Sequence, residues 1–450
     1  MENLDGTIVT TAAPRIAHSL HVGPAEVGLL ITAYLLSVAI LIPLSGWMTQ
    51  RYGARRVFLS AIGVFTVASL GCALCNTLPE LVGMRVLQGV GGAMMVPVGR
   101  LVVLVDTEKS DLLRLIAYIA WPGLLAPVVA PLVGGVITTF ASWRWLFLIN
   151  IPLGGLAFAV AWRLVRTTAE SSRRALDAVG VILTGAGLGG LVATAHFLSA
   201  PRINASAVVT IGLSSLVLSA LAVRHLLRAR APLLNLRILR IPTLRCAIGS
   251  GSMSWLVIGA TPFLLPLMFQ TVLGWSPIKS GAVVLFVFVG NVGIKPATTP
   301  ILRRFGFRTV LITSTLALAA TMLALAFITA GTPVAVVAIL SVLTGVARSV
   351  SLTAYSTIGL SEVSAEQLPD ANVLTTTAQQ LSAGFAIAAA TMALRAGQSI
   401  THVASGSPSR GAPYMAAFMI LALVAILAST TAARLHPHAG ALVSKKATTQ

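Results

Sequence analysis

The chain has 450 residues, of which 56% are hydrophobic and only 10% are charged. A soluble domain carries about 25% charged residues, so this composition excludes an ordinary water-soluble protein. The formal net charge of +19 raises the question of nucleic-acid binding, but no basic and aromatic surface remains to form a groove, and we expect no nucleic-acid partner.

Apolar runs of bilayer-spanning length recur along nearly the whole chain, and they predict an all-α membrane protein. We expect fourteen transmembrane helices, near residues 4–18, 26–49, 57–77, 80–105, 112–139, 145–165, 178–199, 205–226, 244–272, 278–300, 309–330, 333–358, 373–396 and 413–434.

The first of these runs is unusually short. Spanning a bilayer takes roughly 20 apolar residues, whereas this run extends from Leu4 to about Ala17 and contains Asp5. We therefore expect the first helix to be truncated, with about ten or more residues missing upstream.

A basic glycine turn occurs twice, at 51–55 (Arg-Tyr-Gly-Ala-Arg) and at 304–308 (Arg-Phe-Gly-Phe-Arg), each time between two apolar runs. This repetition predicts a duplicated helix bundle, which is the usual architecture of a secondary transporter. We expect two pseudo-symmetric six-helix halves with two inserted helices between them. The predicted parts are an N-terminal half (1–165), the inserted helices with a basic linker (166–243), a C-terminal half (244–434) and a tail (435–450).

The distribution of positive charge predicts the orientation of the chain. Of the 31 Lys and Arg residues, 21 lie in alternate loops that share one side of the membrane, and six lie in the opposite loops. By the positive-inside rule the basic loops are cytoplasmic, and an even number of crossings places both termini there.

Asp5 and Arg85 are the candidate proton-coupling residues. A charge at bilayer depth costs about 2.5–3.5 kcal/mol on insertion scales, so Asp5 is expected to face a cavity or a partner and to carry a proton. The alternative is a solvated Asp at a helix end. Arg85 keeps its charge at any working pH and can hold or release a neighbouring carboxylate's proton; the alternative is a structural Arg bonded to backbone carbonyls.

The fifth predicted helix contains Pro122, Pro127 and Pro131, followed by Gly134 and Gly135. Prolines bend a membrane helix and glycines allow a close neighbour, which suits a rocking joint between moving halves. A kinked helix with a purely structural role is the alternative.

Four polar residues are candidates for a substrate cavity: Gln88, Asn291, Gln379 and Gln380. The helices of the second half contain Lys295 and Arg348 but no acidic residue, so a site there is neutral or basic and favours neutral or anionic substrates. We find no metal-ligand pattern, no phosphate-binding loop and no hydrolase motif. We therefore expect no enzyme activity and no cofactor.

Together these segments resemble the major facilitator superfamily, specifically its fourteen-helix drug:proton antiporters of the QacA and EmrB type. The resemblance covers essentially the whole chain and rests on the stretches 4–14, 46–56, 85–92, 130–135 and 143–154, of which the last is the most specific. The run 88–101 is similar to the MdtD/HsrA-like branch of that family.

The resemblance implies a bacterial inner-membrane exporter with Asp5 and Arg85 in proton coupling. It also implies a set of gating residues: Gly46, Gln50, Arg51, Gly53, Arg55, Pro127, Pro131, Gly134 and Gly135. The chain departs from the family pattern at Gln50, where the family usually has Asp, and at Ala126 and Ala130, where it usually has Gly. The loop before Asn372 is also shorter.

These observations predict proton-coupled efflux of small hydrophobic compounds by alternating access, carried out by a monomer in the lipid bilayer. Two alternatives remain open at this point. One is a metabolite facilitator or importer without proton coupling, and the other is a truncated homologue that does not transport.

Overall fold

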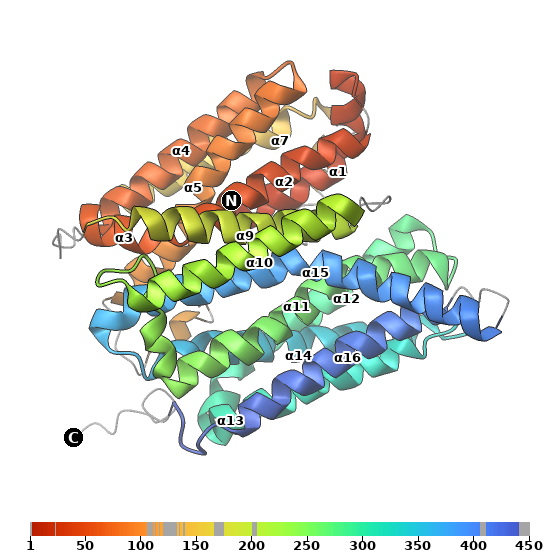
Figure 1. Ribbon diagram of the computed structural model, residues 1–450. Coiled ribbons are helices and arrows are strands. Elements are labelled where there is room, and N and C mark those ends of the chain that lie inside the picture. Colours follow the sequence, from red (N-terminus) through yellow and green to blue (C-terminus); the bar gives the residue numbers. More distant parts are fainter. Residues whose placement is uncertain are drawn as a thin grey trace.

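A computed structural model describes residues 2–22, 24–105, 111–112, 114–116, 118–119, 133–134, 136–137, 140–165, 175–199, 205–405 and 411–440. Within these residues the chain forms helices and no strands, and the long helices run side by side (Figure 1). A helix satisfies its own backbone hydrogen bonds, which is what a chain surrounded by lipid requires. The expected all-helical membrane fold is confirmed.

The helices fall into three consecutive groups. The N-terminal bundle contains α1 (Glu2–Leu20), α2 (Pro24–Leu41), α3 (Leu44–Tyr52), α4 (Ala54–Leu74), α5 (Leu78–Val105), α7 (Trp145–Leu148) and α8 (Asn150–Leu164). Next come the inserted helices α9 (Ala178–Ser199) and α10 (Ala205–Arg228), followed by the short η1 (Leu236–Arg240). The C-terminal bundle contains α11 (Pro242–Thr271), α12 (Pro277–Gly293), α13 (Lys295–Ala326), α14 (Val334–Ser361), η2 (Ala365–Gln367), α15 (Leu368–Ser405) and α16 (Ala412–Ala433).

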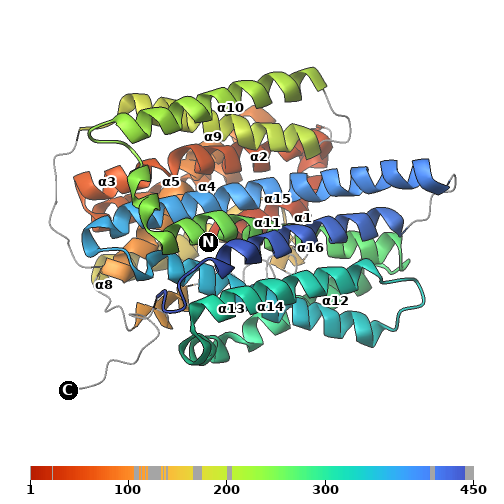
Figure 2. The same cartoon turned by 60° about the horizontal axis from the view of Figure 1, so that its bottom comes forward.

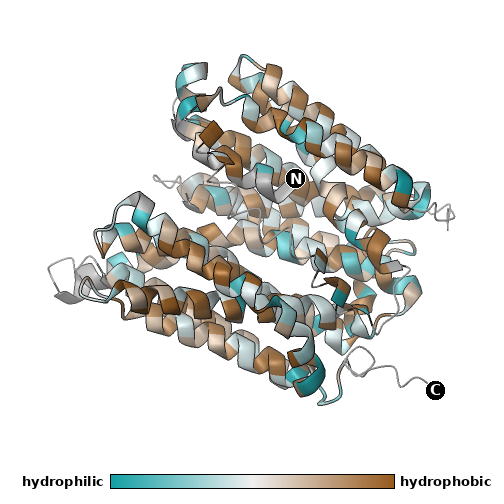
Figure 3. Cartoon of the chain, turned by 180° about the vertical axis from the view of Figure 1, so that it is seen from behind, coloured by the Kyte–Doolittle hydropathy of each residue, from teal (hydrophilic) through white to brown (hydrophobic). Residues whose placement is uncertain are grey.

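Among the described residues nine helices are long and apolar enough to cross a membrane, or ten if the bent pair α2–α3 counts as one span. Every predicted helix has a counterpart except the fifth (112–139), most of which lies outside the described residues. The helix count of fourteen therefore stays a prediction. Hydrophobic residues, drawn in brown, recur along the helices (Figure 3). Many large apolar side chains are exposed; Leu213, Leu216 and Val217 of α10, for example, are each more than half exposed, as expected for a face in contact with lipid.

Two predicted helix boundaries are wrong. The second predicted helix (26–49) is broken into α2 and α3, which meet at an angle of 58°. Pro43 lies at the break, where it removes a backbone donor and its ring clashes with the preceding turn. The tenth predicted helix (278–300) ends earlier, at Gly293, and Lys295 begins α13 immediately before Pro296; a residue preceding proline is disfavoured in a helix interior.

The two basic glycine turns adopt the same backbone conformation. Gly53, between α3 and α4, has φ 81° and ψ 142°. Gly306, which breaks α13 into two helical segments, has φ 75° and ψ 163°. This region, with positive φ and extended ψ, is open essentially only to glycine. The turns are therefore structurally equivalent, which supports the predicted duplication. We call the end of the molecule that carries these turns the basic end.

The inserted helix α9 packs against both bundles, on one side of the molecule (Figure 2). Thr32 Oγ1 of α2 lies 3.0 Å from His196 Nδ1 of α9, and Arg395 Nη1 of α15 donates to the carbonyl oxygen of Leu198 at 2.9 Å. Glycines permit this close approach, since a Cβ at Gly189 would lie 2.9 Å from Ile40 of α2.

Asp177 fixes the basic end of the inserted pair. Its carboxylate accepts from the Gly180 and Leu233 backbone N–H groups at 2.8 and 3.1 Å, and it lies 2.8 Å from His225 Nε2 of α10. Partial burial opposes ionisation, but these hydrogen bonds outweigh it and lower the pKa of Asp177 below its ordinary value. The linker after α10 is thus tied to the start of α9.

Candidate functional site

Asp5 of α1 and Arg85 of α5 form an ion pair in the interior of the N-terminal bundle. Arg85 Nη1 donates to Asp5 Oδ2, and both residues are 1% exposed. The structure therefore brings together the two residues that were predicted to act in proton coupling, although their role in that process stays a prediction.

Two amides complete the surroundings of the carboxylate. Gln88 Nε2 and Asn150 Nδ2 both donate to Asp5 Oδ1, at 3.1 and 2.9 Å. Gln88 lies one turn after Arg85 on α5, and its Oε1 accepts from Arg85 Nη1 at 2.7 Å. Four side chains from three helices thus form one buried network.

The network is held in place by a second layer of contacts. Gln88 Nε2 also donates to Ser69 Oγ of α4 at 2.7 Å. The guanidinium of Arg85 lies 5.4 Å from the ring centre of Tyr34 and 5.0 Å from that of Phe147. Aromatic faces attract a cation, so they stabilise the charge of Arg85 where water is excluded.

This arrangement links protonation to contacts between helices. An ionised carboxylate only accepts hydrogen bonds, whereas a protonated one is neutral and can donate. Protonation of Asp5 would therefore remove the charge that Arg85 requires, and breaking a buried pair from one side costs about 3–5 kcal/mol. Helices α1, α5 and α8 all contribute side chains to the network around Asp5, so their packing depends on whether the pair is intact.

Five of the gating residues lie at the basic end: Gly46, Gln50, Arg51, Gly53 and Arg55. Gly46 of α3 is buried against α15, where a Cβ would lie 3.1 Å from Val373 Cγ2. Gln50 lines a small cleft that Asp177 and Asp370 also line. Arg55 Nη2 donates to the Trp162 carbonyl oxygen at 2.6 Å.

Arg51 is exposed and Gly53 forms the turn described above. Gly134 is buried. Pro127, Pro131 and Gly135 lie outside the described residues.

Two further contacts at the basic end join α5 to the C-terminal bundle. Arg100 Nη2 donates to the Ser356 carbonyl oxygen at 3.3 Å, and Asn372 Nδ2 donates to the Pro97 carbonyl oxygen at 2.8 Å. Together with the packing of Gly46 on Val373, these contacts hold the two bundles together at this end.

The four predicted cavity residues do not form one group. Gln88 belongs to the Asp5 network, where its amide is already engaged. Asn291 is fully buried on α12. On α15, Gln379 and Gln380 are both partly exposed, and Gln379 Nε2 donates to Ser356 Oγ at 3.0 Å.

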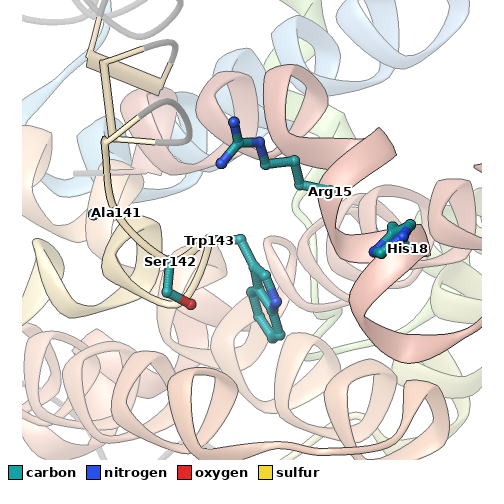
Figure 4. Close-up of a pocket in the computed structure, with 5 residues that line it drawn as sticks. All are labelled: Arg15, His18, Ala141, Ser142 and Trp143. Atoms are coloured by element: carbon teal, nitrogen blue, oxygen red, sulfur yellow. The ribbon is translucent and has the colours of Figure 1, made fainter.

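A pocket of about 420 Å³ opens at the end of the molecule opposite the basic end. Arg15 and His18 of α1 line it on one side and Ala141, Ser142 and Trp143 on the other (Figure 4). The second of these walls is fixed by the neighbouring Arg144, whose Nη2 donates to Cys75 O at 3.2 Å and to Asn76 Oδ1 at 3.0 Å.

Sequence reasoning missed Asn150 and Ser69 as members of the network. Asn150 is a polar residue in the otherwise apolar part of the stretch 143–154, and that isolation was an available signal. Ser69 carried no such signal, because small hydroxyl residues are frequent along these helices.

Comparisons with known proteins agree with this architecture. The family model for the Major Facilitator Superfamily matches residues 1–387. MdtD of Pectobacterium carotovorum subsp. carotovorum (strain PC1), which carries the name of a multidrug resistance protein, is 32% identical over 434 residues, covering 95% of this chain and 92% of that protein. MdtD of Klebsiella pneumoniae (strain 342) is 34% identical over 397 residues, covering 88% and 83%.

Two solved structures share the fold. The human organic anion transporter MFSD10 (TETRAN) has a TM-score of 0.68 at 13% identity and covers 96% of each chain. The proton:xylose symporter XylE, bound to 6-bromo-6-deoxy-D-glucose, has a TM-score of 0.62 at 15% identity, covering 95% of this chain and 91% of that chain.

The chain belongs to the Major Facilitator Superfamily. It is a multi-pass membrane transporter and not an enzyme, in agreement with the prediction from sequence. Within the described residues, no group of three or more His, Cys, Asp or Glu side chains is placed to hold a metal ion.

Proposed function

We propose that the protein exports small hydrophobic compounds across the bacterial inner membrane in exchange for protons, as a monomer with both termini in the cytoplasm. The observation that carries the proposal is the buried Asp5–Arg85 pair, in which a carboxylate of α1 is bound by side chains of α5 and α8. The name of the MdtD relatives, which share about a third of their residues with this chain, supports a drug or drug-like substrate.

In the proposed cycle, the intact ion pair favours one arrangement of the N-terminal bundle and protonated Asp5 favours the other. A proton entering down its gradient neutralises Asp5, and its departure on the other side restores the pair. Moving one charge across 100 mV supplies about 2.3 kcal/mol. That amount can drive a modest substrate gradient for each proton.

The gating residues have a matching role in this proposal. Contacts at the basic end, including the packing of Gly46 against Val373, break when the cytoplasmic side opens. The turn after α3 moves together with these contacts. Its shape is set by Gln50, Arg51, Gly53 and Arg55. We place the bend for the motion in the fifth predicted helix, at Pro127, Pro131, Gly134 and Gly135.

The test is efflux of fluorescein, an anionic aromatic dye, from cells that express the chain, with and without an uncoupler. We expect uncoupler-sensitive efflux from the unmodified protein and loss of proton dependence in Asp5→Asn at an unchanged level in the membrane. Glu26→Gln is the matched control, because Glu26 is an exposed acidic residue of α2. Proton-coupled efflux at the unmodified rate in Asp5→Asn would contradict the proposal.

One observation favours a second candidate, a facilitator without proton coupling. Gln50 supplies no charge at the basic end, and it shares its cleft with two aspartates. Efflux from the unmodified protein that an uncoupler does not change would select this candidate.

A further inference from the structure

Two cations of the C-terminal bundle, Lys295 and Arg348, lie on helices that contain no acidic residue. Residues 242–361, which span α11 to α14, contain no Asp or Glu. Lys295 is 5% exposed, and its Nζ donates to the neutral hydroxyl of Thr353 at 2.7 Å. The Arg348 guanidinium lies 5.9 Å from the ring centre of Phe288, and its Nε and Nη1 atoms have no hydrogen-bond partner in the described part of the chain.

The packing of α12 and the start of α13 against α14 places these residues along one seam. A Cβ at Gly345 of α14 would lie 1.8 Å from the carbonyl oxygen of Val287, so the two backbones nearly touch there. Val287 with Gly345 and Lys295 with Thr353 are both pairs separated by 58 positions. The helices therefore run in parallel and in register between these two points.

Asn291 lies between these points, and its backbone nitrogen would lie 2.9 Å from a Cβ at Gly345. Asn291 and Ser349 are both 0% exposed. Neither the amide nitrogen and oxygen of Asn291 nor the Ser349 hydroxyl has a hydrogen-bond partner among the residues that the structure describes. The seam thus combines two cations with three neutral polar atoms that lack partners.

Such a combination is unfavourable unless something else occupies it. Each buried polar atom without a partner costs about 1–3 kcal/mol, and a cation at bilayer depth costs about 2.5–3.5 kcal/mol on insertion scales. A carboxylate would meet these needs, because an Arg guanidinium binds it with two parallel hydrogen bonds and a Lys ammonium adds a point charge. Membrane-buried ionisable residues of this kind mark substrate pathways by default.

We propose that Lys295, Arg348 and Asn291 form the binding site for the carboxylate of a transported organic acid. The inference rests on the proposed function and narrows its substrate class to apolar compounds that carry a carboxylate. Phe288, which lies against Arg348, supplies an apolar surface beside the charge. The single buried carboxylate of the N-terminal network is already paired with Arg85, which leaves it unsuited to hold a cationic drug at the same time.

The test uses fluorescein, an aromatic dye that carries a carboxylate, and the purified full chain in detergent at neutral pH. Fluorescence anisotropy measures the Kd of fluorescein, and ethidium serves as the cationic counterpart. We expect Lys295→Met and Arg348→Gln each to raise the fluorescein Kd about tenfold or more, since a charge-assisted hydrogen bond is worth about 1.5–3 kcal/mol. Lys295→Arg should retain binding, which separates loss of charge from misfolding.

Lys279→Met is the matched control, because Lys279 lies on α12 but is exposed and stacks on Trp275. The fluorescein Kd of this variant should equal that of the unmodified protein. Equal fluorescein Kd values for the unmodified protein, Lys295→Met and Arg348→Gln would overturn the site. Absence of fluorescein binding, or tighter binding of ethidium, would do the same. The uncoupler sensitivity of fluorescein efflux from the unmodified protein is scored separately from these Kd values, so the site and the proton-coupled function can fail independently.

Discussion

Asn150 is a neutral side chain that is expected to stabilise the buried ion pair. Its amide donates to Asp5 from the start of α8, and the bond is shielded from water. Asn150→Ala should destabilise the protein by about 1.5–3 kcal/mol, the value of a hydrogen bond to a charged group. Thermal unfolding in detergent micelles measures the change.

Asn76→Ala is the control for that variant. Asn76 also makes a side-chain hydrogen bond, with Arg144, but it is exposed. Substitutions at exposed positions usually change stability by less than about 0.5 kcal/mol. Equal losses of stability in the two variants would show that the buried hydrogen bond stabilises the protein no more than the exposed one.

The turn glycine Gly306 provides a second test at a single position. A Cβ there would meet no atom within 4 Å, so any penalty in Gly306→Ala comes from the backbone conformation alone. We expect a loss of about 1–3 kcal/mol. Gly63 also has open space around it but lies inside α4, and Gly63→Ala should be neutral or stabilising by up to about 1 kcal/mol. A stabilised Gly306→Ala variant would contradict this account.

At the level of single residues, sequence reasoning identified the charged members of the network and missed its neutral ones. Asp5 and Arg85 were predictable because a charge inside an apolar run is costly and must have a partner. Asn150 and Ser69 acquire their roles only when α4 and α8 are packed beside α5, and that packing is not encoded in local spacing. For the same reason, Gln88 was expected to line a cavity, whereas the structure places it beside Asp5.

Among the elements, α9 depends most on close packing by glycine. Gly185 and Gly189 face Ile40 of α2, and Gly187 and Gly190 face serines of α10. Gly189→Leu would force its side chain into the space of Ile40, and overpacking of this kind costs about 1–3 kcal/mol. Thermal unfolding should show this loss, whereas Gly28→Leu on α2, where a Cβ meets nothing within 4 Å, should not.

The existence of the helices was predictable from the apolar runs, but their breaks were less so. The run 26–49 stays apolar through Pro43, so hydropathy alone joined two helices that the backbone chemistry of proline separates. The position of α9 between α2 and α15 was not predictable either, because it depends on contacts more than a hundred residues apart in the chain.

For the molecule as a whole, the contacts at the basic end predict that a covalent link there stops transport. A Cβ at Gly46 would lie 3.9 Å from the Val373 Cβ, within the 3.5–4.5 Å range of disulfides. The double variant Gly46→Cys/Val373→Cys should therefore cross-link under oxidation, lose dye efflux and regain it on reduction. The three native cysteines are buried and do not compete.

Gly63→Cys/Val373→Cys is the control, because the surroundings of Gly63 contain no atom of α15 within 4 Å; it should neither cross-link nor lose efflux. Full efflux from the cross-linked Gly46→Cys/Val373→Cys protein would mean that the two bundles do not separate at the basic end during transport.

The position of α9 between α2 and α15 also restricts where a compound dissolved in the lipid enters the protein. The boundary between the two halves of a transporter is the place where a compound can enter laterally from the bilayer. Here α9 is bonded to α2 through His196 and to α15 through Leu198, with α10 laid over it. On this side of the molecule α9 covers the boundary between the two bundles. Lateral entry from the bilayer is therefore confined to the other sides.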